Sequence, residues 1–235
     1  DYKDDPGNNV LLRISPGYIT EVTRAALAAN MSVATHCIGI RGNSLCLDSY
    51  REALEDFPGY DHRLRIEHAQ VVNKEDIERF AESGIIPAMQ PTHCTSDKDM
   101  IEERIGEKRS EYAYAWRSFI DKGLPVPGGS DFPVEPTNPF PGIYAAVSRK
   151  LPTEDGSAGW HKEQSMTIEE AIKSFTIWGA YAGFRDDKLG SIEPGKLADF
   201  TIIDKDLLSI DPELIPSVKV KYTITGGRIV YSATE

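Results

Sequence analysis

The stretch SVATHCIG at residues 32–39 decides the fold of this chain, because two later stretches repeat its design. RLRIEHAQ at residues 63–70 and PVPGGSDFPVE at residues 125–135 also lead from a short apolar run to a side chain able to bind metal. Small or turn-forming residues follow these three side chains, which are His36, His68 and Asp131. In a parallel barrel the carboxyl ends of the strands meet at one mouth. The pattern therefore predicts that two histidines and an aspartate gather there as metal ligands.

The composition allows one large domain, or one domain and a small companion, in 235 residues of which 40% are hydrophobic. Lysine and arginine total 26 against 37 aspartates and glutamates, which gives a net charge of −11. This balance argues against partners such as nucleic acid or an anionic membrane surface. The acidic start DYKDDPGNN differs from a signal peptide. No apolar run approaches the roughly 18 residues that span a bilayer.

Three cysteines are too few, and too irregularly spaced, for a disulfide framework or a cysteine zinc site. They are Cys37, Cys46 and Cys94. We therefore expect a reducing compartment, and the cytoplasm as the location.

Helical and extended patterns alternate along the first part of the chain, which is typical of parallel βα units. Ser15 and Pro16 suit the start of a helix over residues 15–30, and Gly84 the end of a helix over residues 73–83. Another helix is expected at about residues 44–56. Strands are expected at residues 32–36, 63–68, 85–90 and 125–131.

The later segments are predicted from their polar and Pro/Gly-rich character. We expect a polar loop from His93 to Gly106, a helix over residues 108–123, a long loop over residues 132–165 and a helix over residues 167–184 capped by Thr167. Long loops at the catalytic face of a barrel often act as lids. The aromatic side chains of this loop are expected to suit an apolar pocket wall, and they are Phe132, Phe140, Tyr144 and Trp160.

Four landmarks follow one another at intervals close to the roughly 30 residues that each unit of an eight-unit barrel uses. They are His36, His68, His93 and Asp131. The landmarks therefore indicate four successive strand ends. After Phe184 the pattern changes to short strands joined by turns, with Gly226 and Gly227 as a hairpin signal. We expect residues 1–185 to form a partial barrel and residues 186–235 to form strands of a small β-sandwich.

Six segments together resemble one protein family. They are ATHCIGIRGN, RIEHAQVV, PAMQPTHCTSD, AYAWRSFIDKG, GSDFPVEPTNPFPGIYAAVSRK and GSIEPGKLADFTIID. The chain is similar to the amidohydrolase superfamily, and within it to amidohydrolase family 3, the YtcJ-like metal-dependent hydrolases. The resemblance implies an α/β fold. It would be the C-terminal half, about strands five to eight, of a TIM-like (β/α)₈ barrel, with the C-terminal strands of the sandwich.

The resemblance also implies the roles of individual residues. In this family a His-x-His pair on the first strand, single histidines on the fifth and sixth strands and an aspartate on the eighth hold one or two metal ions. His36 corresponds to the fifth-strand ligand, His68 to the sixth-strand ligand and Asp131 to the aspartate. The implied cofactor is a divalent metal, with zinc the expected ion. The implied reaction is hydrolysis of a carbon–nitrogen bond, other than a peptide bond, in a small-molecule substrate such as an amide or formamide.

Two departures from the family pattern keep a second interpretation open. The chain contains no His-x-His, and Ile40 stands where the family has an aspartate. A truncated or degenerate relative with a binding or regulatory role is the alternative. The missing N-terminal half, or a second copy of the chain, is the expected protein partner.

The chemistry of the side chains suggests a division of labour. Imidazole and carboxylate are good zinc ligands, and Asp131 is also expected to act as the general base. His93 is expected to contact substrate or stabilise an oxyanion, with Asp97 and Arg109 as further substrate-binding candidates. A histidine considered alone is more often a satisfied core or loop residue. Glu67 should point to the opposite strand face from His68 and form a salt bridge.

Overall fold

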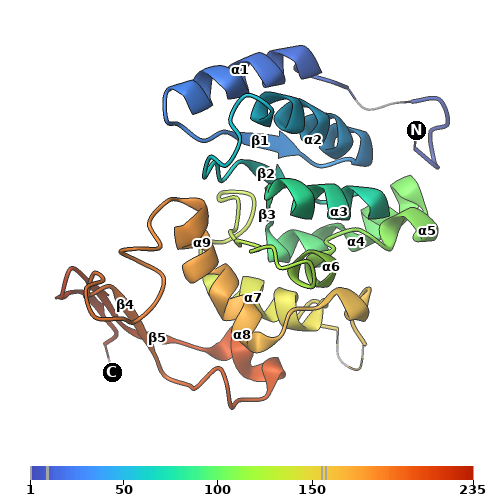
Figure 1. Ribbon diagram of the computed structural model, residues 1–235. Helices are drawn as coiled ribbons and strands as arrows, with labels where there is room; N and C mark the ends of the chain where they lie inside the picture. The colour runs from blue at the N-terminus through green and yellow to red at the C-terminus, as the bar shows by residue number, and fades with distance from the viewer. Residues whose placement is uncertain (1, 9–10, 155, 157, 235) are drawn as a thin grey trace.

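The computed structural model describes residues 2–8, 11–154, 156 and 158–234 as a mixed α/β protein (Figure 1). In the view of Figure 1 the elements follow one another from the blue N-terminal helices at the top to the orange helices at the bottom. A small antiparallel sheet near the C-terminus lies to one side. Within the described residues, no helix combines the length and apolar character needed to cross a bilayer.

A three-stranded parallel sheet carries the first part of the chain. Its strands are β1 (Ala34–Cys37), β2 (Arg65–His68) and β3 (Ile86–Ala88), in that spatial order. Apolar side chains of the sheet and of the helices that pack on it form the buried core. These residues include Leu47, Tyr50, Leu64, Ile66, Phe80, Ile85 and Phe119. The strand order agrees with the predicted succession of parallel βα units.

The first three helices follow the local signals in the sequence. In α1 (Pro16–Ala28) the Ser15 hydroxyl accepts a hydrogen bond from the Tyr18 amide, as predicted for a cap. The helix α2 (Ile40–Leu54) begins four residues earlier than expected. The helix α3 (Lys74–Ser83) ends at Gly84, whose φ of 65° is readily adopted by glycine.

The predicted polar loop from His93 to Gly106 is wrong, because all of these residues except the terminal Gly106 lie in the helix α4 (Pro91–Ile105). Its buried side is built largely from small and polar residues, among them Cys94 and Thr95, so the sequence lacks the apolar periodicity of an ordinary helix. Pro91 occupies the first helical position, where no backbone donor is needed. His93 therefore lies in the first turn of a helix and not in a loop.

The predicted helix over residues 108–123 is also interrupted. It consists of α5 (Glu107–Ser110) and α6 (Trp116–Ile120), and Tyr114 between them has a φ of 51°. The Tyr114 amide donates to the Gln70 carbonyl over 2.7 Å. This long-range pairing replaces the helical hydrogen bonds.

The expected strand over residues 125–131 is reduced to a single parallel bridge between Met89 and Gly128. Pro125 and Pro127 lack the backbone donors that a ladder needs. Gly128 packs closely on the end of a later helix, where an added Cβ would lie 2.6 Å from the Ser174 hydroxyl and 3.2 Å from the Phe175 ring. The strand position is therefore occupied, but by backbone that pairs only once.

The long loop predicted over residues 132–165 contains the helix α7 (Pro139–Ser148) and a 3₁₀ turn, η1 (Lys162–Gln164). Phe140 and Tyr144 are buried in the core, and Tyr144 also lines a cavity of about 170 Å³ with Thr95, Glu135 and Pro141. The predicted helix over residues 167–184 is split into α8 (Ile168–Ser174) and α9 (Ile177–Ala182). Thr167 caps α8 as expected, through a capping box with Glu170.

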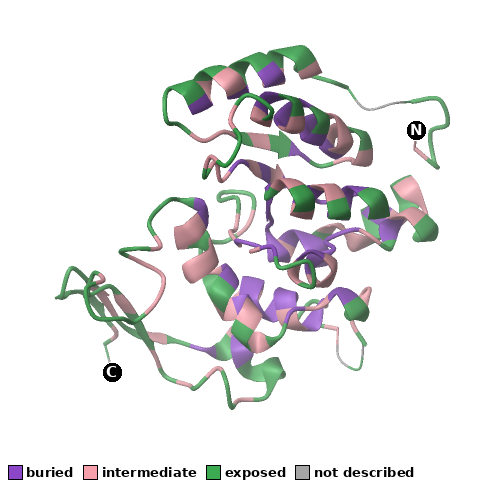
Figure 2. Cartoon of the chain, viewed as in Figure 1, coloured by how far each residue is buried: buried purple, intermediate pink, exposed green. Residues whose placement is uncertain are grey.

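The C-terminal part forms an antiparallel sheet of β4 (Phe200–Ile203), β5 (Val220–Thr225) and β6 (Arg228–Ser232), with η2 (Pro212–Ser217) before β5. Gly226 and Gly227 connect β5 to β6 with φ values of 56° and 77°, which confirms the hairpin signal. Figure 2 shows that this sheet is mostly exposed, whereas buried residues gather around β2, β3, α4 and α7.

Candidate metal centre

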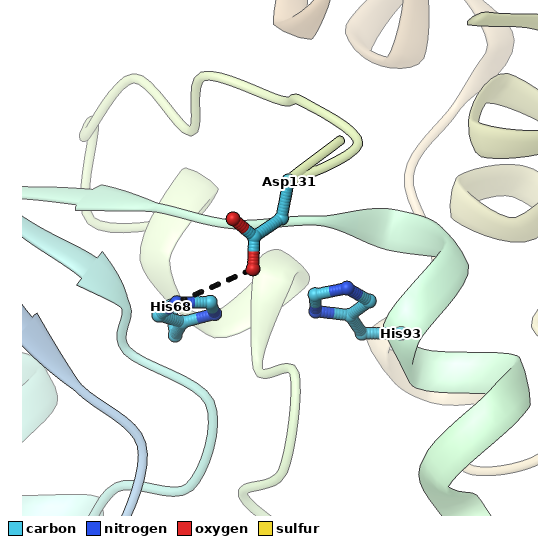
Figure 3. A group of neighbouring side chains, drawn as sticks. All are labelled: His68, His93 and Asp131. Carbon is cyan, nitrogen blue, oxygen red and sulfur yellow. Dashed lines mark ion pairs between the residues drawn. The ribbon is translucent and has the colours of Figure 1, made fainter. Parts of the chain in front are cut away.

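Three titratable side chains converge near the carboxyl end of β2. His68, His93 and Asp131 each place a potential ligand atom within 4.8 Å of the others (Figure 3). In Figure 3 the Asp131 carboxylate points toward the space between the two imidazole rings. Residues far apart in the sequence are thus brought to one place by the ends of β2 and the bridge at Gly128, together with the first turn of α4.

His68 is the last residue of β2, and its backbone is unusual. Its φ is 75° and that of Ala69 is 41°, so two successive non-glycine residues adopt left-handed conformations. Each such residue is held at a free-energy cost of about 1–3 kcal/mol. The Val71 amide donates to the Ile38 carbonyl over 3.0 Å and helps to fix the turn. The buried His68 Nδ1 has no hydrogen-bond partner.

His93 is the third residue of α4 and is also buried. Its ring is nearly parallel to that of His68, with an interplanar angle of 9° and centroids 5.9 Å apart. The His93 Nε2 atom is buried without a hydrogen-bond partner. Sequence reasoning placed His93 at the mouth as a substrate contact, and the structure additionally places it among the candidate ligands.

Asp131 lies in a tight turn with a φ of 52°, and its carbonyl accepts a hydrogen bond from the Val134 amide over 2.9 Å. Its side chain is 44% exposed, and its Oδ2 lies 3.9 Å from the His68 Nε2. The carboxylate is therefore open to water and also faces a buried ring.

His36, on β1, lies beside this cluster. Its ring centroid is 4.4 Å from that of His68, in an edge-to-face arrangement with an interplanar angle of 71°. The side chain is exposed, and it lies outside the group of ligand atoms within 4.8 Å of one another. The three predicted ligands are thus neighbours, with His93 in the tight group and His36 at its edge.

The electrostatics of the cluster favour a neutral His68. Burial, followed by the adjacent His36, lowers its pKa from the ordinary value of 6.5, while Asp131 acts in the opposite direction. A neutral imidazole is the form that binds metal. The two unpaired nitrogens, on His68 and His93, and the adjacent carboxylate fit a divalent cation of the kind held by nitrogen and oxygen ligands.

Asp97 lies one helical turn beyond His93. Its Oδ2 accepts hydrogen bonds from the side-chain amide of Gln70 and from the Tyr114 hydroxyl, both over 3.0 Å. Neither Gln70 nor Tyr114 was selected from the sequence as a site residue. The polar glutamine in an otherwise apolar stretch after His68 was the available signal.

Arg109 is placed elsewhere. Its Nε donates to the Ile105 carbonyl at the far end of α4, roughly 18 Å along the helix from His93 at 1.5 Å per residue. The structure therefore does not bring Arg109 together with the histidines.

Glu67 points away from His68 and pairs with Arg65, with 2.9 Å between Oε1 and Nε. The salt bridge agrees with the prediction. The two side chains line a cavity of about 260 Å³ together with Gln90, Gly128 and residues of α9.

A second constellation imitates a catalytic triad. The Ser110 hydroxyl lies 3.0 Å from His161 Nε2, and His161 Nδ1 lies 3.4 Å from Glu163. Ser110 is fully buried, however, and its hydroxyl donates to the Glu107 carbonyl. The arrangement is therefore structural, because a nucleophile must reach its substrate.

Comparison with known proteins decides the family. A model of the amidohydrolase family matches residues 11–231. The chain belongs to the amidohydrolase family. The resemblance inferred from the sequence motifs is thereby confirmed.

Curated relatives match the chain along almost its whole length. The Bacillus subtilis protein YtcJ is 35% identical over 98% of this chain, and the Arabidopsis thaliana protein LONG AFTER FAR-RED 3 is 34% identical over 98%. An N-substituted formamide deformylase of Arthrobacter pascens is 26% identical over 94%. The amidohydrolase chain spans 43%, 39% and 40% of these relatives, about two fifths of their length.

A solved structure agrees with this assignment. An uncharacterized metal-dependent hydrolase from Pyrococcus furiosus is 30% identical, with a TM-score of 0.76 over 88% of this chain and 41% of that structure. The amidohydrolase fold of the present chain is thus shared with a metal-dependent hydrolase.

Proposed function

We propose that this chain supplies part of the active site of a metal-dependent hydrolase that cleaves carbon–nitrogen bonds in small molecules. The observation that carries the proposal is the cluster of His68, His93 and Asp131, in which two buried ring nitrogens lack hydrogen-bond partners. Buried polar atoms are nearly always paired, so two unpaired ring nitrogens in a cluster with a carboxylate favour a missing ligand. His36, in contact with the His68 ring, is a further ligand candidate.

We also propose that the sheet is part of a (β/α)₈ barrel, with β1, β2, β3 and the backbone at Gly128 corresponding to strands five to eight. Support comes from the parallel order of the three strands and from the bridge between Met89 and Gly128. The remaining ligands would come from the rest of the protein, or from a second copy of the chain. In this proposal the sheet β4–β6 belongs to the small sandwich of the family.

A divalent metal, with zinc the proposed ion, would be held by His36, His68 and Asp131, and it would supply a Lewis acid for the scissile carbonyl and a more acidic water. Asp131 is 44% exposed and can take the proton of the attacking water. The same carboxyl group then hands the proton to the leaving amine. Its carboxylate points toward the rings (Figure 3).

His93 would stabilise the negative charge that develops on the carbonyl oxygen, because its buried Nε2 is available to donate a hydrogen bond. The formamide deformylase among the relatives suggests a substrate class, an N-substituted formamide or a related small amide.

The free thiols of Cys37, Cys46 and Cys94 support a reducing location such as the cytoplasm.

One feature favours a second candidate function, a non-catalytic binding protein. Ile40, the first residue of α2, replaces an acidic residue of the family pattern close to the strand that carries His36. Loss of a polar group there would weaken substrate binding or proton transfer.

Metal content separates these two functions. Elemental analysis of the purified 235-residue chain after dialysis should find about one tightly held divalent ion per chain. The same chain should then be assayed with N-substituted formamides. A folded chain that retains no metal would contradict the proposal for this chain and favour the binding protein.

A further inference from the structure

The second turn of α4 holds the two sides of the metal-binding cluster at a fixed separation. Asp97 accepts hydrogen bonds from Gln70, two residues after His68, and from Tyr114. The preceding residue, Ser96, donates in another direction to Glu135, four residues after Asp131, over 2.9 Å. The helix that carries His93 is thus tied to the segments that carry both of its partners.

The hydrogen bonds of Asp97 to Gln70 and Tyr114 are more deeply buried than the hydrogen bond of Ser96 to Glu135. Gln70 and Tyr114 are almost completely buried, whereas Ser96 is exposed and Glu135 is half-buried. Hydrogen bonds to a charged acceptor are stronger than neutral ones, and the loss of an acceptor leaves buried donors unpaired. The hydrogen bonds of Asp97 should therefore contribute more than that of Ser96 to the position of α4.

The backbone at Tyr114 is itself held by hydrogen bonds. Arg149 is fully buried and donates to the Tyr114 carbonyl over 2.8 Å and the Ala113 carbonyl over 3.2 Å. Burial, together with the Asp97 carboxylate, raises the pKa of Tyr114 well above its ordinary value of 10, so the hydroxyl keeps the proton that it donates. In the hydrogen bond between these two residues, Tyr114 is thus the donor and Asp97 the acceptor.

His93 and Asp97 are four residues apart and lie on the same face of α4. A rotation of the helix that carried His93 away from His68 would also carry Asp97 away from Gln70. The turn that needs support is the strained one, because His68 and Ala69 both have positive φ. The Gln70 side chain follows directly after them.

We propose that Asp97 is a positioning residue, and that its hydrogen bonds to Gln70 and Tyr114 hold His68, a proposed metal ligand, in register with His93, the proposed oxyanion donor. This proposal rests on the proposed function, because it treats the two histidines as parts of the metal-dependent active site. It gives Asp97 a role other than the direct substrate contact expected from the sequence.

The test compares Asp97→Ala with Asp99→Ala, which removes an exposed carboxylate from the same helix. The first readout is the nitrogen–proton correlation spectrum of the histidine rings in the metal-free chain. Asp97→Ala should shift the ring signals of both His68 and His93, and Asp99→Ala should leave them in place. Asp97→Asn retains an acceptor oxygen and should restore most of the original positions.

The second readout is the affinity for Co²⁺, followed by its visible absorption. Asp97→Ala should weaken Co²⁺ binding by roughly tenfold or more, since loss of an outer hydrogen-bond partner commonly weakens metal sites by 10–100-fold. Failure of the unmodified chain to bind Co²⁺ would count against the proposed function. The ring spectra would still decide the positioning role.

Ring signals in folded Asp97→Ala that coincide with those of Asp99→Ala would overturn the proposal. If Asp97→Ala does not fold, Tyr114→Phe removes one of the two donors and retains the aromatic ring. That variant should shift the same two ring signals by a smaller amount, and unshifted signals would again refute the role of Asp97.

Discussion

The imidazole rings of His68 and His93 lie face to face, 9° from parallel, with centroids 5.9 Å apart. One ring comes from the end of a strand and the other from the first turn of a helix, so their alignment depends on tertiary packing. Each ring has one buried nitrogen without a partner. A cation bound at His68 and a substrate oxygen held by His93 would provide these rings with partners, and the predictions below follow from this arrangement and its supports.

Loss of a histidine ligand should abolish metal retention. His68→Ala and His36→Ala, made in the protein that carries the remaining barrel strands, should each reduce bound metal to near zero, because each removes one of the three ligands that this chain is proposed to supply. Elemental analysis after dialysis measures the effect. His161→Asn is the matched control, since it removes a histidine outside the cluster, and asparagine tolerates the φ of 45° at that position. Unchanged metal content in His68→Ala would rule out its role as a ligand.

Removal of the carboxylate at Asp131 should affect turnover more than folding. Asparagine is nearly isosteric and tolerates the φ of 52°, so Asp131→Asn should melt within a few degrees of the unmodified protein. Its turnover of an N-substituted formamide should fall by about 10²–10⁴-fold, because a general base is lost. Asp99→Asn serves as the control. Near-normal turnover in Asp131→Asn would exclude Asp131 as the base.

The two glycines before Asp131 should respond differently to a methyl group. In Gly128→Ala the new Cβ would displace the Ser174 hydroxyl from its buried hydrogen bond to the Val126 carbonyl, and it would press on Phe175. Overpacking of this kind destabilises a fold by about 1–3 kcal/mol. Gly129→Ala meets no atom within 4 Å and should change stability by less than about 0.5 kcal/mol. Denaturant unfolding of both variants checks the prediction, and equal midpoints would contradict it.

Stability should fall when His62 becomes protonated. The Leu64 amide donates to His62 Nδ1, and His62 Nε2 lies 2.9 Å from the Ser83 carbonyl, an arrangement that requires the neutral ring. Burial lowers the pKa of His62 from its ordinary value of 6.5. Below about pH 6.5 the unfolded chain therefore binds the proton more readily, and the free energy of unfolding decreases as the pH falls toward the folded pKa.

Denaturant unfolding between pH 7.5 and pH 5 measures this effect, with His62→Gln as the comparison. The unmodified chain should lose more stability over that interval than His62→Gln, which has no proton to take up at that position. Identical pH profiles would show that His62 is not responsible.

Local signals were sufficient to predict parts of the fold. The Ser15 cap, the Gly84 stop, the Thr167 cap and the Gly226–Gly227 hairpin all depend on neighbours a few residues away, and each is confirmed. The segment at Tyr114 could not be predicted in this way. Its helical pattern is overridden by a backbone hydrogen bond to Gln70, a residue distant in the sequence.

The candidate site was predictable where strand ends determine it and not where a helix contributes. His68 and Asp131 follow apolar runs, and the structure places the His68 Nε2 3.9 Å from the Asp131 Oδ2. His93 was assigned to a loop because the helix around it has a polar sequence. The supporting role of Gln70 depends on where Asp97 points, and that direction follows from tertiary packing.

The positive φ angles of His68 and Asp131, 75° and 52°, also bear on how this site could evolve. Histidine, aspartate and asparagine are the side chains, apart from glycine, that tolerate such backbone most readily, and the first two are themselves metal ligands. Exchange between them would add little strain to either turn while altering the ratio of nitrogen to oxygen donors. A carboxylate-rich version would suit harder ions such as manganese, whereas an imidazole-rich version would suit zinc. The same backbone could thus accommodate a drift in metal preference through single substitutions.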